Sequence, residues 1–455
     1  MLTSVPRAAT KVIVPQPVRV SGRLVPVRSE PARAPTPWHA PRALGPVRGQ
    51  IALPGSKSIT NRALVLAALA DGESLIRRPL RARDTELMVE ALRALGVHIA
   101  DKDDDWRVEP ESLHGAVVAT GLAGTVMRFV PALAGLARGP VTFDGDERAR
   151  ERPMWALIDG LRQAGVVVED AGRERLPFTV RGNGVIAGGR VHVDASGSSQ
   201  FISGLLLAGA RYDKGLELLH TGSDPVPSQP HLDMTVDMLH GAGVDVSRPS
   251  ASAWHVAPGP IRARTLTVEP DLSNAAPFLA AAVVTGGAVT VPGWPEQTTQ
   301  PGDDLPELLS RMGARVDRQA DAVTIAGTGS ISGLDVDLRN VTELAAVIAA
   351  MAALADSPSR LRGLAHTRGH ETDRIVALAT ELRRLGGSVT ELDDGLAITP
   401  RPLHGEIWHA YGDHRMATAG AVLGLLVDGV RVDDISVTSK TLPEFPALWS
   451  GLIGR

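Results

Sequence analysis

An internal repeat constrains what this chain can fold into more than any other feature of its sequence. Six segments share one pattern, in which a polar or glycine-containing turn leads into a helix-length run rich in Ala, Leu and Val. Self-similarity at a nearly fixed period indicates one supersecondary unit that is used several times. The segments begin 65–76 residues apart, at Ser56, Gly121, Gly197, Asp271, Val341 and Gly412.

Each repeat predicts a β-α-β-α-β-β unit. The first helix is apolar on nearly every side, for example over residues 63–70 and 345–354, and a helix without a polar face is buried. The second helix carries charges, such as Glu381 and Arg384, and should lie outside the sheets. Runs such as VTFDG and FTVRG alternate as strands do. We therefore predict an α/β fold with two similar domains, each of three repeats with buried helices, as in an inside-out α/β barrel.

The length of the chain and the position of the repeats divide it into domains. A chain of 455 residues is too long for one ordinary core, so two domains are expected. We predict domain I over residues 43–54 plus 270–455 and domain II over residues 55–269, with three repeats in each. Hinges near Pro54–Gly55 and Glu269–Pro270 would let the two domains close on a ligand.

The N-terminal region differs from the rest of the chain. Residues 1–50 hold eight Lys and Arg residues against one acid, Glu30, with frequent prolines and no helical periodicity. A signal peptide needs a continuous apolar stretch, which this region lacks, whereas an Arg-rich and acid-poor transit peptide remains an alternative. We predict that residues 1–42 form a disordered tail.

Composition excludes several classes of protein. The formal net charge is −4, so no global field attracts nucleic acid. The absence of cysteine excludes a disulfide framework, a thiolate metal site and a cysteine nucleophile. No apolar run reaches the roughly 18 residues that a membrane span needs. We therefore expect a soluble, cytoplasmic protein.

The starts of the repeat helices form a candidate anion site. A helix N-terminus presents unpaired N–H groups and a partial positive charge, so six such ends brought together would attract anions. Several ends add cations, namely Lys57 and Arg62 in LPGSKSITNR, Arg128 and Arg415, while Glu343 stands at the fifth start. N-capping is the alternative role of the Ser, Thr and Asp residues. It does not explain the cations, whose partners must be internal acids or a ligand.

Seven motifs stand in a fixed order along the chain: LPGSKSITNRALVLAALADG, AGTVMR, ERPMWALIDGLRQAG, SGSSQF, HETDR, YGDHRMA and SKTLPEFP. From about residue 43 to the C-terminus the chain resembles the 5-enolpyruvylshikimate-3-phosphate synthase family of enolpyruvyl transferases. The resemblance implies two domains of three β-α-β-α-β-β units. It also implies transfer of the enolpyruvyl group of phosphoenolpyruvate to the 5-hydroxyl of shikimate 3-phosphate, through a tetrahedral adduct and with release of phosphate. No metal or redox cofactor is implied.

Carried over motif by motif, the resemblance implies two sets of substrate contacts and three catalytic groups. Shikimate 3-phosphate would contact Lys57, Ser58, Arg62, Ser198, Ser199, Gln200, Ser228, Glu343, His366 and His370. Phosphoenolpyruvate would contact Lys57, Gly124, Thr125, Arg128, Arg152, Gln200, Arg374, Asp413, Arg415 and Lys440. Glu343 would take the proton of the 5-hydroxyl, and Glu371 with Lys57 would act at C3 of phosphoenolpyruvate. The substrates would bring about six negative charges to seven cations.

Four positions depart from the family's pattern. Asn and Lys are common where His366 and His370 stand, Tyr where His231 stands, and Asp where Glu343 stands. A histidine binds phosphate when protonated, but weakly near neutral pH. His366 and His370 could also suggest a metal site with Asp373 nearby. No third ligand with a convincing spacing follows, so we expect no metal.

Two other functions are weighed against this reading. The UDP-N-acetylglucosamine enolpyruvyl transferase shares the architecture and chemistry, but it usually has Lys-Asn where this chain has Lys57-Ser58, and a cysteine on a mobile loop. An RNA-binding or RNA-end-processing protein of similar repeats would need a basic stripe with stacking aromatics, and aromatics are only 3% here. We expect a monomer that binds small-molecule substrates, binds no nucleic acid or membrane, and is inhibited by glyphosate beside Gly124.

Overall fold

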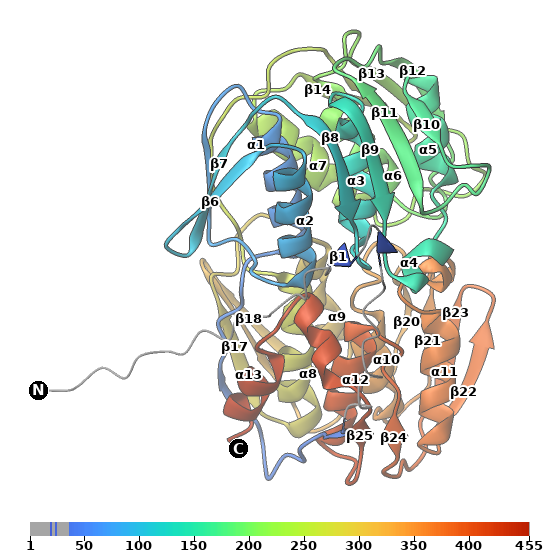
Figure 1. Cartoon of the computed structure of the whole chain (residues 1–455). Helices are drawn as coiled ribbons and strands as arrows, with labels where there is room; N and C mark the ends of the chain where they lie inside the picture. Colours follow the sequence, from blue (N-terminus) through green and yellow to red (C-terminus); the bar gives the residue numbers. More distant parts are fainter. Residues whose placement is uncertain (1–18, 21–22, 25–35, 455) are drawn as a thin grey trace, which may run out of the picture. The chain divides into compact units, whose positions relative to one another are not determined.

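The structure is a computed structural model that describes residues 19–20, 23–24 and 36–454 (Figure 1). The chain divides into two compact units, Met1–Thr36 and Pro37–Arg455. In the first unit, β1 (Arg19–Val20) and β2 (Arg23–Leu24) pair antiparallel. Most of the predicted disordered tail lies outside the described residues. The remaining strands and all the helices of the described part of the chain belong to the second unit.

The twelve helices that the repeat predicts are all present. The first helices of the units are buried along nearly their whole length, because few of their positions carry polar side chains. They are α1 (Lys57–Ala68), α3 (Gly124–Ala134), α6 (Gln200–Gly209), α8 (Ala276–Thr285), α10 (Ala345–Ala353) and α12 (His414–Gly424). Glu381, which the sequence assigned to the outer face of the fifth second helix, is instead buried, whereas Arg383 and Arg384 are exposed. All the second helices except the sixth, which has no charged residue, expose charged side chains. The six second helices are α2 (Arg83–Ala94), α5 (Trp155–Gln163), α7 (Gln229–Gly241), α9 (Leu305–Arg311), α11 (Arg374–Arg384) and α13 (Phe445–Leu452).

Short helices fill the connections between these elements. α4 (Glu147–Glu151) precedes α5, and four 3-10 helices lie next to repeat helices. The 3-10 helices are η1 (Leu272–Ala275), η2 (Pro301–Asp304), η3 (Ala365–Gly369) and η4 (Ile435–Lys440). Among the described residues, no helix is both long enough and apolar enough to cross a membrane.

Each of the first five units contributes a small sheet with one parallel and two antiparallel pairings, which is the pattern that a β-α-β-α-β-β order produces. The sixth sheet has one parallel and one antiparallel pairing. Five sheets have four strands and the sixth has three, and the described strands of this unit form six separate sheets. In spatial order the first three are β16 (Thr265–Thr267), β5 (Ser74–Arg77), β7 (Asp105–Glu109), β6 (His98–Lys102); β10 (Val167–Glu169), β11 (Phe178–Asn183), β9 (Arg138–Asp144), β8 (His114–Ala119); and β12 (Gly189–Val193), β13 (Leu216–His220), β15 (Ala253–Val256), β14 (Val246–Ser250). The other three are β18 (Arg315–Gln319), β19 (Ala322–Ala326), β17 (Ala288–Pro292), β4 (Arg48–Gln50); β20 (Asp335–Asp337), β21 (Ser359–Arg362), β23 (Gly395–Thr399), β22 (Ser388–Leu392); and β24 (Ile407–Trp408), β25 (Arg431–Val432), β3 (Trp38–His39).

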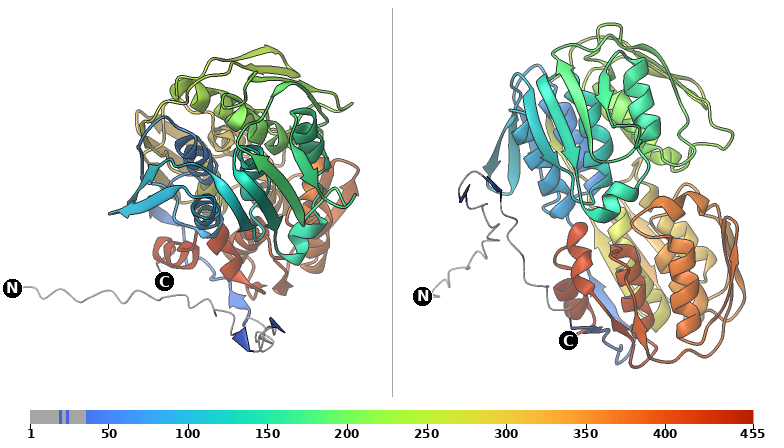
Figure 2. Two further views of the ribbon diagram at one scale, coloured as in Figure 1. Left: turned by 45° about the horizontal axis from the view of Figure 1, so that its top comes forward. Right: turned by 45° about the vertical axis from the view of Figure 1, so that its right-hand side comes forward.

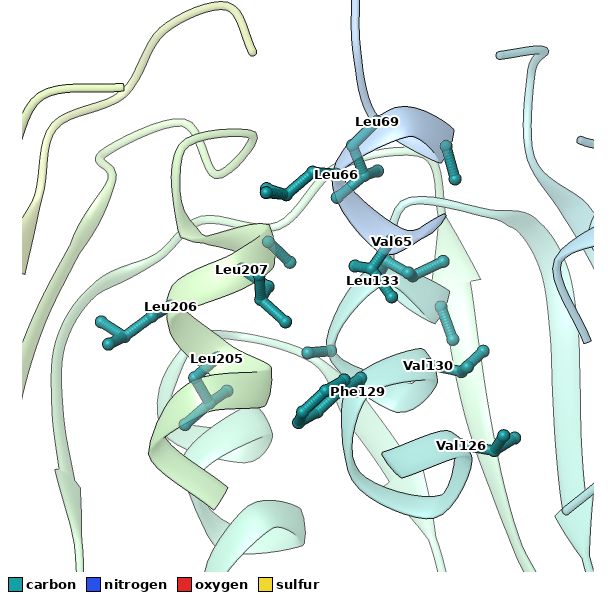
Figure 3. Packing of buried hydrophobic residues seen from close by; sticks show 14 of the residues in the cluster. Val65, Leu66, Leu69, Val126, Phe129, Val130, Leu133, Leu205, Leu206 and Leu207 are labelled. Atoms are coloured by element: carbon teal, nitrogen blue, oxygen red, sulfur yellow. The ribbon is translucent and has the colours of Figure 1, made fainter. Parts of the chain in front are cut away.

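The buried hydrophobic residues form two clusters, which we call the central lobe and the terminal lobe. The central lobe lies between Ile59 and Val268, and the terminal lobe combines residues 40–53 with residues 272–449. In the central lobe, the apolar side chains of α1, α3 and α6 pack together between the sheets, as Figure 3 shows for Val65, Phe129 and Leu205 among others. Figure 2 shows helices enclosed by sheets in both lobes. The predicted domain boundaries stay a prediction.

The chain passes between the lobes twice, and the two passages lie side by side. Gly55 and Pro270 form an antiparallel bridge. The backbone N–H of Ser56 donates to Glu269 O at 2.7 Å, and that of Asp271 donates to Pro54 O at 2.8 Å. Each passage also completes a sheet, because β16 pairs parallel with β5 and β4 pairs parallel with β17. The predicted hinge positions therefore coincide with these two passages.

One boundary needs a correction. Trp38 and His39, which the sequence assigned to the tail of residues 1–42, form β3 and pair antiparallel with β25. Ala40 is buried, and its N–H donates to Val430 O at 3.0 Å. The physical reason is that the sixth unit ends with α13 and brings no closing strands of its own. A strand from before the first unit supplies the antiparallel partner.

Candidate active site

All six repeat-helix starts line one cavity of about 100 Å³, between the central and terminal lobes. Each start brings N–H groups without intrahelical partners, so the wall of the cavity favours anions. The loop that leads into α11 adds His370, Glu371 and Arg374. From the six starts come Lys57, Gly124, Gln200, Asp271, Glu343 and Arg415.

Local capping interactions position these side chains. Asp413, the fully buried N-cap of α12, accepts a hydrogen bond from the backbone N–H of Arg415 at 2.8 Å. Its other oxygen accepts from Arg374 Nε at 2.7 Å, so one carboxylate holds two arginines of the cavity. Burial alone would lower the pKa of Arg374, but Asp413 and Glu371 raise it above its ordinary value. Arg374 therefore stays charged.

A second network joins two lysines to acids from both lobes. Asp84, in the first turn of α2, lies 3.4 Å from Lys57 Nζ and 3.9 Å from Lys440 Nζ. Lys440 also donates to Glu371, whose other oxygen lies 3.3 Å from Arg374 Nη2. Asp84 belongs to the central lobe, whereas Glu371 and Lys440 belong to the terminal lobe. This network therefore bridges the cavity.

Four buried arginines have no acid within salt-bridge distance. They are Arg62, Arg128, Arg152 and Arg415, and among the described residues the guanidinium group of each has only neutral hydrogen-bond partners or none. Nε and Nη1 of Arg152 and Nε of Arg415 are buried without any such partner. Burial lowers the pKa of Arg62 to about 9. Because an unpaired buried cation is costly, these side chains are candidates for binding an anionic ligand.

Two carboxylates face the cavity and are ionised at rest. Burial favours the neutral form of Glu343, but His231, with its Nε2 3.6 Å from Glu343 Oε1, and nearby arginines lower the pKa below its usual value. Burial acts in the same sense on Glu371, but Lys440, Arg374 and Arg152 bring its pKa well below the usual range. Within the described structure, Glu343 Oε2 is buried without a hydrogen-bond partner. It can accept one from a ligand.

A second cavity of about 50 Å³, which we call the side cavity, adjoins the first. Ser198 and Ser199 lie at the start of α6, and Ser228 is the N-cap of α7 with a left-handed φ of 53°. Arg62 faces the same space, although its N–H groups already donate to the Thr235 hydroxyl at 2.8 Å and to other neutral groups. The remaining polar lining consists of Ser58, Thr125, Gln200, His231, Glu343, His366 and His370.

The structure brings the sequence-predicted residues into one region. Most of them line the two cavities. Arg128 lines an adjoining pocket together with Arg152. Asp413 and Lys440 are bonded to residues of the wall.

Several polar residues of the cavity were not among the predicted site residues. Among them are Ser56, Asp84, Asp271, Ser273, Gln300 and His414. Ser56, Asp271 and His414 stand at repeat-helix starts, so the repeat marks their positions. Asp84 opens a second helix, and the second helices were taken only as outer cover. Gln300 follows β17, and no signal in the sequence points to it.

The two histidines that could suggest a metal lie together but do not complete a ligand set. The ring centroids of His366 and His370 are 5.8 Å apart. Over residues 36–454, no group of three or more His, Cys, Asp or Glu side chains is placed to hold a metal ion.

Comparisons with known proteins agree with this geometry. The family model described as EPSP synthase (3-phosphoshikimate 1-carboxyvinyltransferase) matches residues 41–449. A curated 3-phosphoshikimate 1-carboxyvinyltransferase of Kocuria rhizophila is 55% identical over 429 residues, which cover 92% of this chain and 96% of that protein.

Solved structures share the fold. An EPSP synthase of Acinetobacter baumannii gives a TM-score of 0.75 at 23% identity, over 91% of this chain and 97% of that one. The enolpyruvyl transferase NikO of Streptomyces tendae gives 0.73 at 18% identity, over 92% and 98%. On the strength of the family model and the curated relative, this chain belongs to the EPSP synthase (3-phosphoshikimate 1-carboxyvinyltransferase) family.

Proposed function

We propose that this chain transfers the enolpyruvyl group of phosphoenolpyruvate to the 5-hydroxyl of shikimate 3-phosphate and releases phosphate. The 55% identity to a curated 3-phosphoshikimate 1-carboxyvinyltransferase over most of both chains carries this proposal. The reaction belongs to the shikimate pathway of aromatic amino-acid biosynthesis. We further propose that the chain acts as a cytoplasmic monomer with these two small molecules, and no nucleic acid, as its partners.

The division of the cavities supports a position for each substrate. The phosphate of shikimate 3-phosphate fits the side cavity, where Ser198, Ser199 and Ser228 lie at two helix N-termini. Phosphoenolpyruvate fits the larger cavity, near the unpaired nitrogens of Arg152 and Arg415. Lys57 and Gln200 lie where the two substrates would meet.

The two carboxylates support complementary proton transfers. Glu343 is ionised at rest and takes the proton of the 5-hydroxyl as that oxygen bonds to C2 of phosphoenolpyruvate. The C3 carbon gains a proton at the same stage, which gives the tetrahedral adduct. Because Glu371 is also ionised, this proton comes from an ammonium group, either that of Lys440, which contacts Glu371, or that of Lys57, which lines the cavity, and Glu371 accepts the C3 proton during elimination. As C3 loses this proton, the C2–O bond to phosphate breaks and Glu343 gives its proton to the departing phosphate. Proton transfer from Glu371 then restores the ammonium group.

Phosphate release measured with each substrate omitted in turn tests the proposal. Release should require both substrates, and UDP-N-acetylglucosamine should not replace shikimate 3-phosphate. Glu371→Gln should lower kcat by about 10²–10⁴-fold, as for loss of a general acid–base group. Glu391→Gln, at an ion pair with Arg383 on the terminal lobe, should leave kcat unchanged. Release that needs no shikimate 3-phosphate would overturn the assignment.

We also propose that the lobes close on the substrates about the passages at residues 54–55 and 269–270. Two strands joined by an antiparallel bridge are the covalent connections there. X-ray scattering with and without shikimate 3-phosphate tests this. A radius of gyration that stays constant at saturating substrate would refute closure.

A further inference from the structure

Three histidines surround the side cavity, and the mechanism above uses none of them for proton transfer. His231 comes from the first turn of α7, His366 lies within η3, and His370 directly follows η3. His231 Nε2 lies 3.4 Å from the Ser58 hydroxyl and 3.6 Å from Glu343 Oε1. His366 Nε2 is buried and has no hydrogen-bond partner among the described residues. The three rings approach the same space from both lobes.

Charged groups face each ring from the surrounding elements. Glu343 and Arg374 each face more than one of the three rings, and among the described residues none of the three rings has a carboxylate oxygen closer than 3.6 Å, the distance from His231 to Glu343. Around His231 these groups are Glu343, Arg62, Lys57 and Asp271. Around His366 they are Glu343, Arg339, Arg374 and Asp337. Around His370 they are Arg374, Glu371, Arg152 and His366.

We propose that His231, His366 and His370 recognise the phosphate ester of the acceptor substrate and take up protons as it binds. The inference rests on the proposed function, because it assumes that shikimate 3-phosphate enters the side cavity. Elsewhere in the site, permanently charged lysines and arginines would neutralise the substrates, whereas here the histidines would do so. The histidines would be neutral in the free protein and would acquire charge when the ester arrives.

The direction of the proton movement follows from burial and charge. Burial lowers the pKa of all three histidines, to about 4 for His366 and well below the usual value for His370, where Arg374 adds to the effect. Near pH 7 they are therefore neutral. A phosphate monoester brings about two negative charges, which favour the imidazolium and raise these pKa values. Binding then takes up protons, so affinity rises as pH falls towards the raised values.

The ionisation of the ester itself would release protons on binding, whereas the histidines would take them up. The sign of the proton exchange therefore tells which group is responsible. A phosphate monoester has a second pKa near about 6, so a site that selects the dianion releases protons at pH 6 and exchanges almost none at pH 7.5. Uptake at pH 7.5 must therefore come from the protein. Calorimetric titration with shikimate 3-phosphate, in buffers of different ionisation enthalpy, measures the number of protons taken up per ester by the unmodified chain.

We expect uptake of about half a proton or more per ester at pH 7.5, and hence a Kd that weakens about threefold per pH unit above 7. The pair His366→Asn with His370→Asn, and separately His231→Gln, should each reduce the uptake and flatten the pH dependence of Kd. His192→Asn, at an exposed histidine on β12 that lines neither cavity, should change neither. Circular dichroism confirms that each variant is folded.

The possible results distinguish failure of the role proposed for the histidines from failure of the proposed function. Binding of shikimate 3-phosphate with no net uptake at pH 7.5, or with uptake that survives all three substitutions, would overturn the role of the histidines and leave the proposed function intact. No detectable binding of shikimate 3-phosphate by the unmodified chain would instead overturn the proposed function. Uptake that disappears only in His231→Gln would overturn the part assigned to His366 and His370.

Discussion

Asp84→Asn is the substitution that best separates positioning from charge in this cavity. Asp84 is almost fully buried in the first turn of α2, and its Oδ2 lies 3.4 Å from Lys57 Nζ and 3.9 Å from Lys440 Nζ. Its Oδ1 has no hydrogen-bond partner among the described residues. The amide of asparagine keeps the shape of the side chain but removes the charge. Lys57 then has no acid within salt-bridge distance, whereas Lys440 keeps Glu371.

The contacts set the size of the effect. At an effective dielectric constant of about 20, a pair at 3.4 Å gains about 5 kcal/mol, and one at 3.9 Å about 4 kcal/mol, before desolvation is counted. Loss of one partner from a buried pair costs about 3–5 kcal/mol. Because Lys57 retains some exposure and Lys440 retains Glu371, we expect the free energy of unfolding to fall by about 2–3 kcal/mol.

Asp84→Asn should affect kcat and the KM for phosphoenolpyruvate differently. Removing a negative charge cannot weaken the attraction of the cavity for an anion, so the KM for phosphoenolpyruvate should stay the same or fall. The ammonium groups that Asp84 holds in place should lose their alignment, and kcat should fall by about 10–100-fold. Steady-state assays and thermal unfolding measure both quantities. Asp335→Asn, at an exposed pair with Arg362, is the matched control and should change neither by a measurable amount. A KM that rises tenfold with kcat unchanged would refute this reasoning.

Three further substitutions test other contacts. Gly124→Ala would bring a Cβ to 3.0 Å from Arg128 Nη1, so we expect the KM for phosphoenolpyruvate to rise about tenfold and inhibition by glyphosate to weaken, with both measured in the phosphate-release assay. Glu381 is fully buried and accepts a hydrogen bond at 2.6 Å from the hydroxyl of Tyr411, in the loop before α12. Glu381→Gln should lower the melting temperature and kcat/KM together. An unchanged kcat/KM would show that other contacts hold the loop. The pKa of Glu371 is depressed in the folded protein. The ionised carboxylate therefore contributes stability above the unfolded pKa of about 4.3, and this contribution is lost as pH falls through the pKa of the folded protein. Glu371→Gln should flatten the acid limb of a curve of unfolding free energy against pH.

Periodicity predicted the fold well because the first helices leave no ambiguity. A helix such as α10, in which every residue is apolar, can only be buried, and six mainly apolar helices at a nearly constant spacing imply six equivalent units. What periodicity cannot give is which strand completes which sheet. β3 pairs with β25 across most of the chain length, and two or three residues carry too little pattern to reveal such a pairing.

The site was predictable where its residues stand at helix starts, since the sequence marks those positions. Lys57 and Arg415 follow turns that precede apolar runs, and both reach the cavity. Asp84 escaped notice because its helix also has an ordinary amphipathic pattern, in which an acid in the first turn reads as a favourable partner of the helix dipole. Only the fold shows that this acid points at two lysines from another part of the chain.

These internal acids change how the charges of the cavity are counted. Setting seven cations against about six substrate charges, as the sequence suggested, leaves out the carboxylates that the structure places among the cations. Lys57, Lys440 and Arg374 are bonded to Asp84, Glu371 or Asp413, whereas Arg62, Arg128, Arg152 and Arg415 have no acid partner. The paired cations are held at fixed positions next to carboxylates, which suits proton transfer and orientation. The four unpaired arginines carry the uncompensated charge, so the attraction for the two phosphorylated substrates rests mainly on them, and the histidines of the side cavity can add charge only when an ester draws protons to them.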